Sequence, residues 1–95
     1  MYPREIEEVL LTCAGVVEAC VVGLPHERWG ESGVAVLVTE SDLRLDEAGV
    51  FAHLDGRLAK YKWPTRVVFW PELPKSGYGK VTKREVKRLL QETDG

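Results

Sequence analysis

The fold is decided by two stretches, VVEACVV at residues 16–22 and GVAVLVT at residues 33–39. Both are rich in β-branched and apolar side chains over the length of one strand, so we predict a strand at each. Residues 24–32 lie between them, which is longer than a tight hairpin needs. We therefore predict an exposed loop there, with Pro25, His26 and Trp29 among its residues.

Helices are predicted on either side of this pair of strands. Pro3 suits a first helical position, and the apolar residues of 6–13 recur at helical spacing before Gly15, so we expect a helix over residues 3–12. Asp46 is placed to cap a second helix, which directs Val50, Phe51, Leu54 and Leu58 toward the core.

The last third of the chain adds a strand, a loop and a helix. We predict a strand at residues 66–70, and irregular structure at 71–79, which holds two prolines and two glycines. Residues 82–85, TKRE, have the spacing of a capping box ahead of a helix with an apolar stripe. The order α-β-β-α-β-loop-α predicts an α+β fold, with helices packed on a small, mainly antiparallel three-stranded sheet.

Composition excludes several classes of function. Ninety-five residues give one compact domain, and a formal net charge of −2 argues against a strongly basic nucleic-acid binder. No apolar run is long enough to span a membrane and no secretion signal is present, so we predict a cytoplasmic protein. Cys13 and Cys20 are expected to be buried apolar residues, and with His26 and His53 they show no metal-binding spacing.

Charge is divided between the two parts of the chain. Residues 1–56 carry a net charge of −8 and residues 57–95 carry +6. We expect the basic part to face an anion, with a solvated helix face as the alternative for Lys83, Arg84, Lys87 and Arg88.

Lys80 ends a loop that contains Gly77 and Gly79, two residues before the predicted helix cap Thr82. A helix start offers unpaired N–H groups and the positive end of a dipole, which favours an anion. Gly79-Lys80 is not part of a phosphate-binding P-loop, because Pro74 stands where that motif needs glycine and Val81 where it needs Ser or Thr.

Residues 73–81, LPKSGYGKV, closely resemble the lysine loop near the C-terminus of the adenylate-forming (AMP-binding) superfamily, nearest to its fatty-acyl-CoA synthetase-like ligases. Three more stretches agree in order: YPREIEEV at 2–9, VVGLP through WGE at 21–31, and YKWP at 61–64. The resemblance implies that residues 1–95 are the small C-terminal domain of an acyl-CoA ligase, with the large N-terminal domain absent. It also implies that the fragment alone is inactive.

In this resemblance Lys80 is the catalytic lysine of carboxylate adenylation, supported by Gly77, Gly79 and Lys75. The small domain then rotates and forms part of the CoA channel. Candidates for the CoA-facing surface are Trp29, Gly30, Glu31, Lys62 and Trp63, with packing or solvated roles as the alternative.

The implied partners are the large adenylation domain, ATP with Mg²⁺, the acyl-adenylate and CoA. The fragment alone is expected to bind none of these ligands tightly. No metal site, nucleic acid or membrane span is expected. Two alternatives stay open: an aryl-acid or peptide-synthetase adenylation enzyme that loads a carrier protein, and a stand-alone non-catalytic docking module. Peptide-synthetase loops commonly read Asn-Gly-Lys-Val-Asp, which the sequence around Lys80 does not match.

Overall fold

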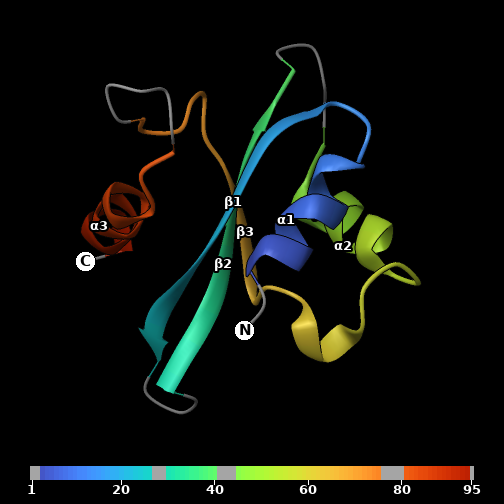
Figure 1. Ribbon diagram of the computed structural model, residues 1–95, viewed down its shortest axis with the longest axis horizontal. Helices are drawn as coiled ribbons and strands as arrows, with labels where there is room; N and C mark the ends of the chain where they lie inside the picture. Colours follow the sequence, from blue (N-terminus) through green and yellow to red (C-terminus); the bar gives the residue numbers. More distant parts are fainter. Residues whose placement is uncertain (1–2, 27–29, 41–44, 76–80, 95) are drawn as a thin grey trace.

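The computed structural model describes residues 3–26, 30–40, 45–75 and 81–94 (Figure 1). Its elements, in order, are α1 (Pro3–Leu11), β1 (Val16–His26), β2 (Gly30–Thr39), α2 (Glu47–Leu54), the 3₁₀ turn η1 (Lys60–Lys62), β3 (Arg66–Phe69) and α3 (Lys83–Asp94). The predicted α+β class and the predicted order of helices and strands are confirmed.

The three strands form one mixed sheet in the order β1-β2-β3. β1 and β2 pair antiparallel from Val16↔Thr39 to His26↔Gly30. β2 and β3 form a shorter parallel pair, which starts at Val34↔Arg66. The longer pairing is antiparallel, as predicted, whereas the parallel pair is a feature that the order of elements did not reveal. It arises because α2 lies in the connection that returns the chain to the same end of the sheet.

The predicted long loop at residues 24–32 is wrong. The β1–β2 ladder continues through Leu24↔Ser32, Pro25↔Glu31 and His26↔Gly30, so only residues 27–29 separate the two strands. Pro25 lacks the N–H that a central strand needs. It is tolerated because β1 is an edge strand with only one neighbour.

Helices cover both faces of the sheet (Figure 1). α1 and α2 pack on one face around a cluster that includes Leu10, Ala35, Leu37 and Leu54. α3 covers the other face, where Val86 and Leu90 pack against a second cluster from β1 and β2. Cys20 is buried in this second cluster and Cys13 is also buried, which confirms the expectation for both cysteines.

Local signals fix the ends of the helices. The Asp46 carboxylate accepts a hydrogen bond from the Gly49 N–H at 2.8 Å, which confirms the predicted cap of α2. Gly15 follows α1 with φ of 88°, a backbone conformation in which glycine is favoured. The capping box predicted at residues 82–85 is not completed, because the Thr82 N–H donates to the Pro74 carbonyl at 3.0 Å and Glu85 pairs with Arg88.

Each edge strand has a backbone amide satisfied by a glutamate from a helix. The Glu7 carboxylate of α1 accepts from the Val21 N–H of β1 at 2.7 Å. The Glu47 carboxylate of α2 accepts from the Val67 N–H of β3 at 3.0 Å. These bonds attach the helices to the sheet and occupy part of each edge, where unpaired amides would otherwise invite pairing with another chain.

Burial raises the pKa of the Cys20 thiol from 9.0 to about 11, with the Glu7 carboxylate adding to the rise and Lys83 opposing it. Below pH 9 the thiol is protonated in both the folded and the unfolded chain, so it costs no stability. Between pH 9 and 11 the unfolded thiol ionises and the folded thiol does not. We therefore expect folding to lose up to about 3 kcal/mol over this range.

Urea denaturation of the native chain and of a Cys20→Val variant between pH 7 and 10.5 measures this loss. The gap between their free energies of unfolding should shift in favour of Cys20→Val above pH 9. Parallel pH curves for the two proteins would contradict the burial of an un-ionised thiol.

Candidate functional site

The central residues of the predicted lysine loop, Gly77, Gly79 and Lys80, lie outside the described residues, as does Trp29. The residues on both sides of segment 76–80 are described. They form what we call the loop base, comprising Leu73, Pro74, Lys75, Val81, Thr82 and Lys83.

Backbone contacts hold the two sides of the loop base together. Lys75 and Val81 form an antiparallel β-bridge. The Thr82 N–H donates to the Pro74 carbonyl at 3.0 Å. Paired residues of an antiparallel bridge have their Cα atoms about 5 Å apart, so the chain leaves and returns at nearly the same point. Lys75 and Val81, the described residues on either side of segment 76–80, are therefore held close together.

Apolar contacts fix the loop base to the α3 face of the sheet. The Leu73 side chain is 3% exposed and belongs to the same cluster as Val22 and Val36. Val81 packs partly buried against that cluster, and Val86 in the first turns of α3 is fully buried in it. Burying side chains of this size contributes about 1.5 to 3 kcal/mol each, which favours a single position for both ends of the segment.

Two ion pairs join the loop base to the acidic part of the chain. The Lys75 ammonium lies 2.8 Å from the Glu18 carboxylate of β1. The Lys83 ammonium lies 2.9 Å from Glu7 of α1, whose same oxygen accepts the Val21 N–H. Both carboxylates are mostly shielded from solvent, at 24% exposure for Glu18 and 18% for Glu7.

Sequence reasoning missed Glu7 and Glu18. A signal for Glu18 was present, because it is the only charged residue in the apolar stretch 16–25. A single carboxylate in such a strand indicates a specific partner, since burying an unpaired charge is costly. Glu7 lies among three acidic residues of α1, and nothing in the sequence distinguished it from Glu5 and Glu8.

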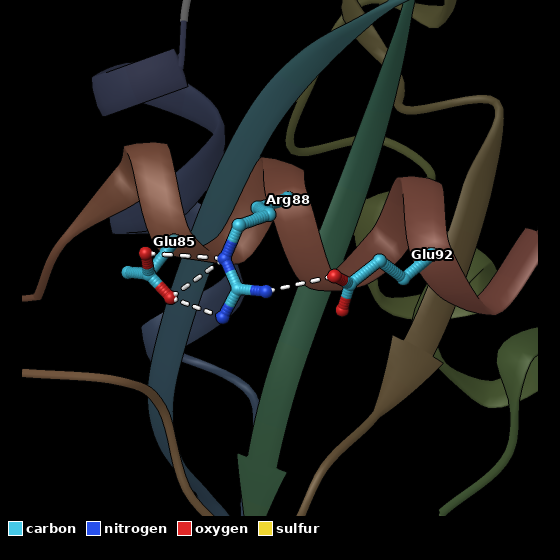
Figure 2. A network of polar contacts seen from close by, with 3 residues as sticks. All are labelled: Glu85, Arg88 and Glu92. Atoms are coloured by element: carbon cyan, nitrogen blue, oxygen red, sulfur yellow. Dashed lines mark hydrogen bonds and ion pairs between the residues drawn. The ribbon is translucent and has the colours of Figure 1, made fainter.

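On α3 the basic side chains are exposed, and Arg88 is engaged by its own helix. Its guanidinium lies between Glu85, at 2.7 Å, and Glu92, at 2.8 Å (Figure 2). The hydrogen bond from Arg88 lowers the pKa of Glu85, and Glu85 and Glu92 raise the pKa of Arg88. Arg88 therefore fits the alternative of a solvated helix face.

Lys62 and Trp63, two of the candidates for the CoA-facing surface, lie on the α1 and α2 side of the sheet. Lys62 pairs with Glu5 of α1 at 3.0 Å. The Trp63 indole donates to the Leu58 carbonyl at 2.8 Å and stacks on Phe51 with ring centroids 5.5 Å apart. These contacts give Trp63 a packing role and Lys62 an ion pair within the domain, and the contact of either residue with CoA stays a prediction.

Gly30 and Glu31 lie at the start of β2, where they pair with His26 and Pro25. The structure does not bring them together with the loop base, because Lys75 contacts Glu18 near the opposite end of β1. Their role in the CoA channel also stays a prediction.

One hollow that the described residues line lies away from the loop base. A hollow of about 450 Å³, lined by Glu5, Glu8, Val9, Thr12 and Arg57, opens beside α1, the helix on the other face of the sheet from Leu73 and Val81. No group of three or more metal-ligating side chains occurs among residues 3–26, 30–40, 45–75 and 81–94. In the same part of the chain, no helix is long and apolar enough to cross a membrane.

The loop base thus holds the two ends of segment 76–80 close together. The loop base leads directly into the N-terminus of α3, where the Val86 N–H donates to the Thr82 carbonyl. The β-bridge and the apolar contacts of the described residues therefore hold both ends of segment 76–80 on the α3 side of the sheet.

Comparison with known proteins assigns the family. Residues 5–80 match the family model described as "AMP-binding enzyme C-terminal domain". The chain is 46% identical to an indoleacetate–CoA ligase of Aromatoleum aromaticum over 95% of its length, and 42% identical to a 2-succinylbenzoate–CoA ligase of Geobacillus kaustophilus over 99%. It spans 18% and 19% of those two proteins.

A solved structure agrees. Crystalline apo MatB from Rhodopseudomonas palustris matches 98% of this chain with a TM-score of 0.92 and 41% identity, over 19% of that protein. The family model covers most of the chain, and the similarity in sequence and in structure extends over nearly all of it. The chain therefore belongs to the family of C-terminal domains of AMP-binding enzymes.

Proposed function

We propose that residues 1–95 are the mobile C-terminal domain of an ATP-dependent acyl-CoA ligase whose large N-terminal domain holds the ATP and acyl sites. The observation that carries this proposal is the family match over residues 5–80 together with relatives that are named CoA ligases. The chain spans about a fifth of those relatives, so the activity belongs to the assembled enzyme. The isolated domain is expected to bind neither ATP nor CoA tightly.

The proposed reaction has two steps. In the first, a carboxylate oxygen attacks the α-phosphorus of Mg²⁺-bound ATP, the bond to the β-phosphate breaks, and acyl-adenylate and pyrophosphate form. In the second, the CoA thiol loses its proton and attacks the acyl carbon, and AMP leaves. The net products are acyl-CoA, AMP and pyrophosphate.

Lys80 is the residue that we assign to the first step. An ammonium is a compact charge with three rotatable donors, so it can contact the carboxylate oxygen and the α-phosphate while negative charge redistributes between them. It acts by electrostatic stabilisation and not as a base. The geometry of the loop base supports this assignment, because it fixes both ends of the segment that carries Lys80.

Rotation of the domain separates the two steps in this proposal. After adenylation the small domain turns, withdraws Lys80 and presents another face toward the path of the pantetheine thiol. Trp29, Gly30, Glu31, Lys62 and Trp63 are the residues that we propose for that face. Contacts within the domain hold Lys62 and Trp63 in place. In this proposal, rotation of the whole domain brings them toward the path of the thiol.

The full-length protein that contains this chain tests the proposal. It is incubated with ATP, Mg²⁺, a panel of carboxylic acids and either CoA or a phosphopantetheinylated carrier protein, and products are identified by mass spectrometry. We expect acyl-CoA, AMP and pyrophosphate in equal amounts. Loading of the carrier protein alone would favour the adenylation-enzyme alternative, and no ATP consumption with any acid would favour a docking module.

A further inference from the structure

We propose that Glu18 and Glu7 are positioning residues of the adenylation step, because their ion pairs with Lys75 and Lys83 hold the two ends of the Lys80 segment. The inference rests on the proposed function of Lys80 and adds two residues to it. Neither glutamate is near Lys80 in the sequence, and neither is expected to contact substrate.

Each ion pair acts on a different side of the segment. Lys75 is the last described residue before segment 76–80, and its ammonium is 2.8 Å from Glu18 of β1. Lys83 follows the segment at the start of α3, and its ammonium is 2.9 Å from Glu7 of α1. The Lys75–Glu18 ion pair therefore fixes the end of the loop base before segment 76–80, and the Lys83–Glu7 ion pair fixes the start of α3.

The two glutamates are themselves rigidly held. Glu18 lies in the β1–β2 ladder opposite Val38, so its backbone position is set by the sheet. Glu7 accepts the Val21 N–H at 2.7 Å as well as the Lys83 ammonium, so one carboxylate oxygen joins α1, β1 and α3. Contacts between an ammonium and a carboxylate are charge-assisted, and they are shorter and stronger than hydrogen bonds between neutral groups.

The β-bridge and the apolar contacts of Leu73 and Val81 keep the loop base folded without these charges. Loss of an ion pair should therefore leave the domain folded and only loosen the positions of Lys75 and Lys83 at the two ends of segment 76–80. A displacement of about 1 Å at a reacting group is enough to cost up to 10²-fold in rate. The effect should fall on the step that uses Lys80 and not on the later thiol attack.

The test uses Glu18→Gln, Glu7→Gln and the double variant in the full-length protein. Glutamine keeps the size of the side chain and, at residue 7, an oxygen that can accept the Val21 N–H. The matched control is Glu92→Gln, which removes a carboxylate from the exposed α3 pair with Arg88, away from the loop base. Single-turnover rates are measured for acyl-adenylate formation and for thioester formation from supplied acyl-adenylate, with thermal unfolding midpoints for each variant.

We expect the double variant to form acyl-adenylate about tenfold more slowly even with saturating ATP and acid, with thioester formation unchanged. The control should match the native protein in both steps. Exchanging the charges, with Glu18→Lys and Lys75→Glu together, should restore part of the rate lost in Glu18→Gln. Unchanged adenylation, or equal losses in both steps with a lower unfolding midpoint, would overturn the inference.

A double-mutant cycle that combines the glutamate substitutions with Lys80→Ala separates this inference from the function on which it rests. If the glutamates act through Lys80, adding their substitutions to Lys80→Ala should cause no further loss of adenylation. A further tenfold loss in that background would overturn the inference alone. Full adenylation by Lys80→Ala itself would instead remove the proposed role of Lys80.

Discussion

The isolated 95-residue chain should unfold in one cooperative thermal transition and catalyse no ATP–pyrophosphate exchange. Folding is expected because the domain closes its own core: two clusters of buried apolar side chains lie on the two faces of the sheet. Within the described residues, no buried side-chain polar atom lacks a hydrogen-bond partner. No ATP–pyrophosphate exchange is expected because, in our proposal, the ATP and acyl sites belong to the large domain.

Differential scanning calorimetry and an exchange assay with a panel of carboxylic acids measure the two parts of this prediction. A chain of this size should absorb about 60 to 80 kcal/mol at its midpoint. The full-length protein in the same assay is the positive control for exchange. Exchange above background by the purified fragment would show that the chain carries its own nucleotide and acyl sites, contrary to the proposal.

Lys80→Ala in the full-length protein is expected to slow acyl-adenylate formation by about 10²- to 10³-fold, as for the loss of one preorganised donor at a developing charge. The ammonium is needed where negative charge moves between the carboxylate and the α-phosphate. Rapid-quench measurement of acyl-adenylate with saturating ATP and acid gives the rate of this step directly.

Lys80→Arg is the matched variant, because it keeps the positive charge and changes its shape. The planar guanidinium is larger and directional, and we expect it to recover little of the lost rate. Recovery to near the native rate would mean that net positive charge suffices and that contact by a compact ammonium is not required.

Much of the fold could be predicted from local patterns. The apolar runs at residues 16–22 and 33–39 gave the two long strands, and Asp46 gave the start of α2. The extension of the hairpin to His26 and Gly30 was missed because Gly23, Pro25 and Gly30 have low strand propensity. Once Val21 and Val22 are paired, each further residue pair adds to the ladder at a small cost in free energy. Strand pairing therefore overrides the low propensity of these residues.

The candidate site was also predicted only in part. The resemblance at residues 73–81 pointed to Lys80, but the charges around it were interpreted as a basic part of the chain facing an anion. In the structure, Lys62, Lys75 and Lys83 each pair with a glutamate of the acidic part. The division of charge therefore serves at least partly to hold the domain together. Local sequence patterns could not reveal this, because each pair joins residues more than fifty positions apart.

The most direct test of the account compares the two half-reactions in Lys80→Ala and the native full-length protein under single-turnover conditions. Acyl-adenylate formation is followed from ATP and acid, and thioester formation is followed from supplied acyl-adenylate and CoA. The account predicts that only the first rate falls, by about 10²- to 10³-fold, while the second stays within about twofold of the native rate. Equal losses in both rates, or no loss in either, would contradict it.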